Sequence, residues 1–562
     1  MNGVSGDSVS AALVALLVVL SGTVVLVSMD APTTDVGDQP ADVYDPPNGD
    51  DPSVNDPGDG PVGDGVGDTP DVTGPDGDAG SQDGPDVPGD GGSGPDVTDP
   101  TDPGDVDPNN DGATDGGIPG DGDTPTPDPE YVDDGVLGFE NGYWYNQTVA
   151  IDQSDGLSDD ELDALVSVTM ARIEYIRGLE FLQPVDTKVM SRAEYRTQVE
   201  AKYNETYEHS LWNNQVWEAL FVTGEDANVS EEFKKLYGGN VLGYYAPKTD
   251  EMVIVSSNPN SPQVDPKVLT HELVHALQDQ HFDLTASLKT VQDEQLGRNG
   301  LVEGEANYVA ALYDEYCGNL WTCTQTPSNT DESNPESPAT GVLIAVFHPY
   351  SDGPVWMEYM VENYGWDAIT AQWEQVPRTT ESIIHPGTSD ESTIVAVEDR
   401  TDGTWTRFDA GQDGADVLGE ASIYSMFYHL AKEDNVRVVN QWEFAEVDSD
   451  YDTFNYESDP SAGWAGDRIV PYQKNGEYGY VWVTQWDTER DAREFFEAYR
   501  DVLDSKRAQA VGVNTWVIQS GPFADAFHVV LDGTTVTIVN APTVEQLTEI
   551  KTDTDVQVWQ RR

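Results

Sequence analysis

Apolar positions recur about every three to four residues in several stretches of the chain, which is the period of an amphipathic helix. One stretch begins at Ser158, a residue type that caps helices, and runs to Arg177. A second, more polar stretch begins at Ser191. We therefore expect helices over residues 158–177, 191–208, 416–431 and 487–503.

Short runs rich in β-branched and aromatic residues predict strands elsewhere. The runs 241–245 and 251–256 lie on either side of a Lys248-Thr249-Asp250 turn, which indicates a hairpin. Four more runs lie near the C-terminus, where Asp532-Gly533 is typical of a tight hairpin turn. The strands expected there are 478–484, 515–519, 527–531 and 534–539.

These patterns predict an α+β protein built from more than one unit. Residues 131–432 form the larger folded domain, and the polar segment 433–462 is a loop-rich connection. Residues 463–562 form a smaller α+β domain in which helices cover a sheet. We see no catalytic chemistry in this smaller domain, and expect it to shape the cleft or to bind a partner.

The N-terminal region has a different composition. Residues 1–9 are a short tail, and 10–29 are an uncharged apolar run that would span about 30 Å, one bilayer core, as a helix. A cleaved signal peptide would need a basic start and small residues before the cut, and both are lacking. We expect an uncleaved transmembrane anchor, with the bulk of the chain outside the cell. Residues 30–130 are mostly Asp, Pro, Gly, Thr and Val, and predict a disordered acidic linker.

The formal net charge of −77, from 104 acidic and 27 basic residues, excludes nucleic acid as a partner because phosphates would be repelled. We interpret the charge as halophilic adaptation, since concentrated salt shortens the Debye length to about 3 Å or less. The alternative is an acidic surface loaded with calcium, although no calcium-loop spacing is present.

Two further features agree with export. Asn146, Asn204 and Asn228 begin glycosylation sequons. The only cysteines, Cys317 and Cys323, are six residues apart and could close a small disulfide loop outside the cell. The other interpretation of the cysteines is two buried thiols.

The sequence His271-Glu272-Leu273-Val274-His275 carries the strongest candidate chemistry. Asp265 and Pro266 are good residues for the first positions of a helix that would contain it. On that helix His271 and His275 project from one face and can bind one zinc ion, and Glu272 lies beside them as a proton acceptor. The alternative is an ordinary amphipathic helix with two surface histidines.

Three residues are candidates for a third ligand. His281 has the outer spacing of the pattern HExxHxxGxxH, but that pattern needs a glycine, to turn the chain back, where this chain has Gln278. On a continuing helix His281 would lie about 15 Å further along the axis than His271. The stretch LVEGEA offers Glu303 and Glu305, far enough after His275 to lie on a second antiparallel helix.

The stretches HELVHALQDQHFDL and LVEGEA resemble gluzincin-type zinc metallopeptidases, and most closely a group of mostly uncharacterised extracytoplasmic prokaryotic members. Residues 377–386 and 463–468 also resemble that group, so the likeness covers roughly residues 160–510. It implies that Glu303 completes the zinc site in a peptidase domain over 131–432. It also implies that Asn307 accepts a hydrogen bond from a zinc-bound histidine, and that the hairpin edges a substrate cleft.

The resemblance further implies a peptidase mechanism on a peptide or protein substrate. Glu272 would take a proton from a water molecule at the metal and deliver it to the leaving amine. A second group must stabilise the oxyanion, and the candidates are His385, Tyr350 and Arg378, with His348 weaker.

Two other functions remain open. An aminopeptidase is one, although no motif like G-x-M-E-N is present to bind a substrate amine. A non-enzymatic surface protein that retains a metal site is the other. The sequence leaves the substrate and the oligomeric state open.

Overall fold

The computed structural model describes residues 135–204, 207–239, 241–285, 291–327, 336–388, 392–447 and 449–559. The predicted tail, anchor and acidic linker, residues 1–130, lie outside these ranges. Among the helices of the described ranges, none is long and apolar enough to cross a membrane.

The N-terminal part combines helices with small sheets. Helix α2 begins after Ser158, whose side chain and that of Glu161 form a reciprocal capping box, so the predicted helix is confirmed. Strand β5 lies at the centre of a three-stranded sheet, parallel to β3 and antiparallel to β4, which confirms the predicted hairpin. The elements are β1 (Phe139–Glu140), β2 (Tyr143–Trp144), α2 (Asp159–Arg177), β3 (Asp186–Ser191), β4 (Gly243–Ala246) and β5 (Glu251–Ser256).

The helix expected over 191–208 is shorter than predicted. Helix α3 (Arg192–Lys202) has the predicted Ser191 cap but ends at Lys202, and α4 (Tyr207–Ala219) is a separate helix, followed by α5 (Val229–Gly238). The amide of Tyr203 still bonds to Val199, so α3 ends within one turn of that residue. No Gly or Pro lies between the two helices, and Asn204 is the only residue type there that favours a helix end.

Two long helices, α6 and α7, pack side by side, and α8 packs on α7. Helices α7 and α8 cross closely at Gly304 and Gly353. A Cβ atom added at Gly304 would lie only 2.5 Å from the carbonyl oxygen of Gly353, so the crossing needs a glycine at this position. Pro349 and Pro354 lie inside α8, where each removes a backbone donor. The helices are α6 (Pro266–Phe282), α7 (Gln292–Glu315), α8 (Thr340–Tyr364), α9 (Trp366–Gln372), α10 (Glu381–Ile384) and α11 (Gly419–Glu433).

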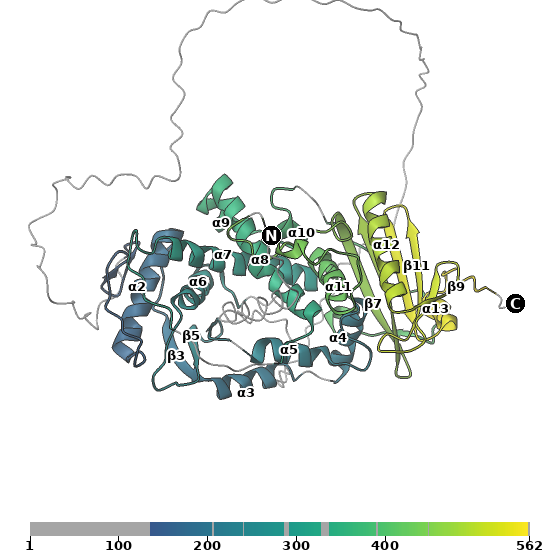
Figure 1. Cartoon of the computed structure of the whole chain (residues 1–562), viewed down its shortest axis with the longest axis horizontal. Helices are drawn as coiled ribbons and strands as arrows, with labels where there is room; N and C mark the ends of the chain where they lie inside the picture. Colours follow the sequence, from purple (N-terminus) through teal and green to yellow (C-terminus); the bar gives the residue numbers. More distant parts are fainter. Residues whose placement is uncertain are drawn as a thin grey trace, which may run out of the picture. The chain divides into compact units, whose positions relative to one another are not determined.

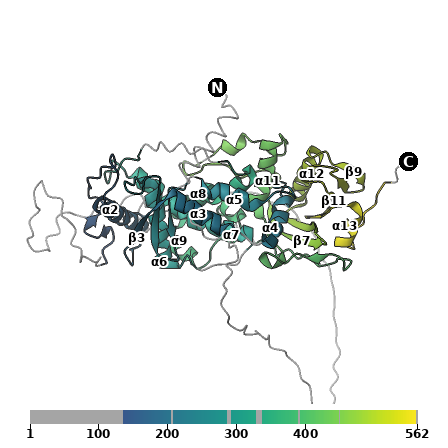
Figure 2. The same cartoon turned by 90° about the horizontal axis from the view of Figure 1, so that it is seen from below.

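The C-terminal part is built on a seven-stranded antiparallel sheet in the order β6-β7-β8-β12-β11-β10-β9. Helices α12 and α13 lie beside this sheet in Figure 1 and Figure 2. The elements are β6 (Thr406–Arg407), β7 (Trp464–Lys474), β8 (Glu477–Trp486), α12 (Glu489–Ser505), β9 (Gln509–Gly512), β10 (Thr515–Val517), β11 (Ala526–Asp532), β12 (Thr535–Ala541) and α13 (Val544–Ile550).

The four C-terminal strands and helices α11 and α12 lie where the sequence predicts them, with Asp532-Gly533 turning between β11 and β12. Strand β7 was not predicted, although residues 463–468, which overlap its start, are among those that resemble the gluzincin group. Strand β6 joins this sheet from residues 406–407, ahead of the predicted boundary at 463. The segment 434–462 contains only a short 3-10 turn, η2 (Glu443–Ala445), among its described residues, in keeping with a loop-rich connection.

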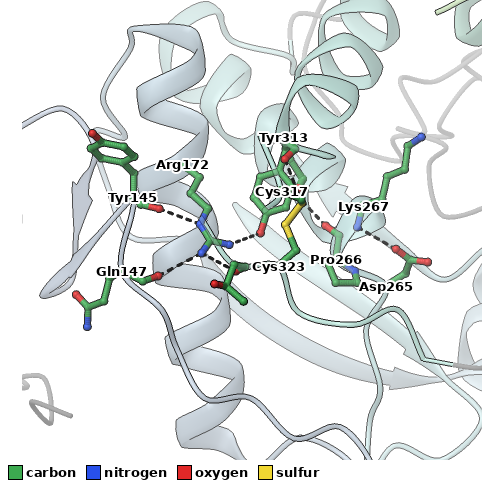
Figure 3. Close-up of a disulfide and its surroundings, with 11 residues drawn as sticks. Tyr145, Gln147, Arg172, Asp265, Pro266, Lys267, Tyr313, Cys317 and Cys323 are labelled. Atoms are coloured by element: carbon green, nitrogen blue, oxygen red, sulfur yellow. Dashed lines mark hydrogen bonds between the residues drawn. A yellow bond between two sulfur atoms is a disulfide. The ribbon is translucent and has the colours of Figure 1, made fainter. Parts of the chain in front are cut away.

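Cys317 and Cys323 form a disulfide just after α7, with their Cα atoms 5.5 Å apart (Figure 3). The buried guanidinium of Arg172 lies beside this loop and donates to the carbonyls of Tyr145, Gln147 and Thr322 and to the Tyr313 hydroxyl. Of the two interpretations of these cysteines, a disulfide loop or two buried thiols, the structure has the disulfide.

Candidate metal centre

Three potential ligands converge where α6 faces α7. The Nε2 atoms of His271 and His275 are 2.9 Å apart, and Glu303 Oε2 lies 3.2 Å from the first and 3.4 Å from the second. The ligand atoms all lie within 4.8 Å of one another, and none of the three residues is more than 2% exposed. The structure therefore brings together the metal ligands that the sequence predicts.

Each histidine is held by a side-chain amide. Gln278 Oε1 lies 2.8 Å from His275 Nδ1, and its Nε2 donates to Val302 O and Glu305 Oε2. Because both of these partners are acceptors, the amide of Gln278 has only one orientation, and His275 Nδ1 must carry the proton. Asn307 Oδ1 lies 3.0 Å from His271 Nδ1 and supports the same tautomer there.

This arrangement leaves three lone-pair atoms facing one another. With both Nδ1 atoms protonated, the Nε2 atoms of His271 and His275 point unprotonated at each other and at the Glu303 carboxylate. Burial lowers the pKa of His271 to about 4, so the Nε2 atom of His271 carries no proton at neutral pH. A cation at their centre removes the repulsion, and tetrahedral zinc prefers this set of nitrogen and oxygen ligands. The residues therefore fit a zinc ion.

Glu272 lies beside the ligands on the same helix and is fully buried. One carboxylate oxygen, Oε2, accepts from the backbone N–H of Tyr245 in β4 at 2.8 Å, while Oε1 has no hydrogen-bond partner among the described residues. Burial and the Glu303 charge raise the pKa of Glu272, and the Tyr245 hydrogen bond only partly opposes them. The predicted hairpin thus positions Glu272 through its backbone, and leaves one oxygen available.

The other two candidates for the third ligand have different partners. His281 Nε2 donates to the carbonyl of Glu180 at 2.7 Å. Glu305 pairs with buried Arg177 and also accepts from Gln278 and Trp373. Neither belongs to a group of converging metal ligands within the described ranges.

Of the four oxyanion candidates, Tyr350 on α8 contacts the centre. Its ring stacks on that of His271, with centroids 6.4 Å apart. Burial and the Glu303 charge raise the pKa of its phenol. Tyr350 lies three residues before Gly353, whose backbone packs closely against Gly304.

The remaining candidates have other partners. His385 Nε2 lies 3.1 Å from Glu420 and its Nδ1 lies 3.6 Å from Glu457. Burial acts to lower the pKa of His385, but these carboxylates outweigh it and raise that pKa to about 10. Arg378 is 78% exposed at its side chain and lies near Glu294. His348 is fully buried, 3.9 Å from Asp352. No contact in the described part of the chain joins these three to the metal ligands.

The role of Gln278 was missed by the sequence argument. In the sequence Gln278 stands where the pattern HExxHxxGxxH has a glycine, and in the structure its amide orients His275. The available signal was its spacing, since a polar residue three positions after a ligand lies on the same helix face.

In the comparisons with known proteins, the one match covers only the C-terminal part of the chain. A family model described as a domain of unknown function, DUF8575, matches residues 406–551. That range begins at β6 and ends just after α13, and it excludes α6 and α7. The search of curated proteins and the search of solved structures found no match.

Proposed function

We propose that this protein is a zinc-dependent peptidase, and an endopeptidase rather than an aminopeptidase. The observation that carries the proposal is the convergence of two histidine nitrogens and the Glu303 carboxylate, with Glu272 beside them. Zinc in such a site is a Lewis acid that lowers the pKa of a water ligand to about 7 and polarises a substrate carbonyl. The choice of peptide bonds as substrate rests on the resemblance of HELVHALQDQHFDL and LVEGEA to gluzincin-type peptidases.

The chain's own residues divide the remaining work. Glu272 Oε1, which has no hydrogen-bond partner among the described residues, is the general base and later the acid toward the leaving amine. The Tyr245 N–H holds the other oxygen, so Glu272 keeps one orientation. Tyr350, next to Glu303 and His271, is the best placed of the predicted oxyanion donors. We assign no oxyanion role to His385, because the carboxylates of Glu420 and Glu457 already contact its ring.

We place this activity outside the cell, on a membrane anchor formed by residues 10–29. The Cys317–Cys323 disulfide supports the placement, because such bonds persist in oxidising compartments.

One observation favours a second candidate, a surface protein that retains a metal for structure or binding. The potential ligands, Glu272 and Tyr350 are all buried, and a structural zinc site is closed whereas a catalytic site keeps an open position. Zinc binding without hydrolysis of any peptide library would favour this candidate.

The test compares Glu272→Gln with the wild-type protein. The variant should retain one zinc per chain and lose chelator-sensitive hydrolysis of unfolded protein, because Gln cannot accept the proton. Glu374→Gln, at an exposed position, is the matched control and should keep both properties. Hydrolysis at the wild-type rate by Glu272→Gln would show that Glu272 is not the general base.

A further inference from the structure

A second convergence of acidic side chains lies far along the chain from the histidine site. Glu218 is at the end of α4, Glu225 follows in the next loop, and Asp525 directly precedes β11. One carboxylate oxygen from each lies within 4.8 Å of the others. Glu218 is 4% exposed and Asp525 is 2% exposed, whereas Glu225 is exposed.

The buried members of this cluster have neutral amides as hydrogen-bond donors. Gln215 Nε2 donates to Glu218 Oε2 at 3.0 Å, and Asn540 Nδ2 donates to Asp525 Oδ2 at 3.0 Å. No Lys, Arg or His pairs with any of the three carboxylates among the ion pairs of the described residues. The negative charge is therefore left without a protein counter-charge.

Two buried side-chain oxygens at this site, one on a cluster member and one on a neighbouring neutral amide, accept no hydrogen bond from the described residues. Asp525 Oδ1 and Asn540 Oδ1 are buried and have no hydrogen-bond partner among the described residues. Asn540 is 1% exposed, and its amide nitrogen is anchored on Asp525. Because the two polar atoms of one amide are neighbours, its unpartnered carbonyl oxygen lies close to the same carboxylate. Buried acceptors of this kind require a donor or a cation.

The electrostatics point the same way. Burial, followed by the charges of Asp525 and Glu225, raises the pKa of Glu218. Burial also raises the pKa of Asp525 to about 7, with Glu225 contributing in the same direction. A bound cation would stabilise the ionised carboxylates at neutral pH.

We propose that Glu218, Glu225, Asp525 and the carbonyl oxygen of Asn540 bind a calcium ion. All four ligands are oxygens and three are carboxylates, a set that suits a hard divalent cation such as calcium, whereas a protein zinc site normally includes at least one nitrogen or sulfur ligand. The backbone prepares the site, since Glu225 N–H donates to Pro522 O at 3.0 Å and a Cβ at Gly224 would lie 2.3 Å from Pro522. The ion joins α4 and its loop to strands β11 and β12, and so fastens the helical part to the C-terminal sheet.

The experiment uses the full chain, loaded with one zinc and freed of other divalent ions. Thermal unfolding is followed while CaCl₂ is added, with MgCl₂ as a parallel arm. Calcium should raise the melting temperature by several degrees in a saturable manner. Glu225→Gln, a change at an exposed side chain, should weaken calcium binding about tenfold or more, because calcium affinity depends on the number of charged ligands.

Asp525→Asn should abolish the calcium response. In the absence of calcium, the melting temperature of this variant should equal or exceed that of the wild type, because the substitution removes a repelling charge. Asp532→Asn, at the exposed end of β11, is the matched control and should respond to calcium as the wild type does. An unchanged calcium response in both Glu225→Gln and Asp525→Asn would overturn the site. The absence of a saturable calcium response in the wild type would also overturn the site. A shared proton or a water molecule would then be the partner of these oxygens. A response to magnesium that exceeds the calcium response would overturn the assignment to calcium.

Discussion

At the scale of single residues, the histidine site depends on the side chains that orient its ligands as well as on the ligands. A buried chain of contacts runs from Arg177 through Glu305 and Gln278 to His275. Each member fixes the next, because Gln278 donates with one end of its amide and accepts with the other. The lone pair of His275 Nε2 is thereby held toward Glu303.

Gln278→Ala should lower zinc affinity about 10- to 100-fold, the usual effect of removing a partner that orients a metal-bound histidine. Competition with a coloured chelator measures this change. Gln280→Ala removes the same type of side chain two residues further along the same helix, where the amide bonds to the 182–183 backbone, and should leave zinc affinity unchanged. Equal affinities in the two variants would contradict the role of Gln278.

The sequence predicted which candidate ligands converge better than it predicted the residues around them. His271 and His275 are fixed by one helical turn, and Glu303 by its spacing and its resemblance to known sites. Asn307 was likewise expected one turn after Glu303, and contacts His271 as predicted. Tyr350 and His385 could not be ranked, because their distance from the centre depends on how α8 crosses α7 and on the partners of His385.

At the scale of elements, α2 is locked to α7 by the buried pair Arg177–Glu305, whose side chains are 1% and 2% exposed. Arg177 also donates to Thr370 and lies over the Trp366 ring. Local helix signals predicted α2, but they contain no information about this partner on another helix.

Arg177→Met should reduce the free energy of unfolding by about 3–5 kcal/mol, because it leaves Glu305 as an uncompensated buried charge. Chemical denaturation measures the change. Arg400→Met is the control, because Arg400 is 47% exposed and its pairs with Glu398 and Asp553 lie in solvent. Similar losses in both variants would contradict the importance of the buried pair.

Near the start of α7, Asp293 gives a test of pH dependence. It accepts from the backbone and hydroxyl of Thr380, and burial raises its pKa to about 8. A carboxyl whose pKa is raised in the folded state favours folding below its unfolded pKa, near 4, and this contribution is lost as pH rises to about 8. Wild-type stability should therefore fall over that range.

Asp293→Asn should lessen this fall, since Asn accepts the same hydrogen bonds without ionising. Denaturant midpoints between about pH 5 and about pH 8 measure the difference, a range set by the two pKa values. Asp367→Asn, at an exposed position on α9, should leave the pH dependence as in the wild type. A parallel curve for Asp293→Asn would show that Asp293 does not titrate in this range.

Elements were predicted well where a local signal exists and poorly where pairing is long-range. Ser158, Ser191 and Asp265 each cap the helix expected from them. Strand β6 has only two residues, too few to show an alternating pattern in the sequence. It begins at position 406, and the next strand of its sheet begins 58 residues later, at position 464. Pairing of β8 with β12 likewise depends on the whole sheet.

At the scale of the whole molecule, the formal charge of −77 is the dominant property. Part of it belongs to residues 30–130, but buried carboxylates such as Asp467 and Glu420 also lie within the folded part. Self-repulsion of this size destabilises a compact state unless salt screens it.

The melting temperature should rise steeply between about 0.1 M and about 1 M KCl, as the Debye length shortens from about 10 Å to about 3 Å. Circular dichroism measures the transition. Sucrose is the control, because it favours burial without screening charge, and it should stabilise the protein much less. Equal stabilisation by both solutes would contradict the interpretation of the acidity as adaptation to salt.

The central claim is that His271, His275 and Glu303 together bind one zinc ion. Anomalous diffraction at the zinc edge, from crystals of zinc-loaded protein, tests it most directly. The account predicts one peak about 2.0–2.2 Å from His271 Nε2, His275 Nε2 and a Glu303 oxygen. Stoichiometric zinc with its peak elsewhere, such as among Glu218, Glu225 and Asp525, would contradict the account.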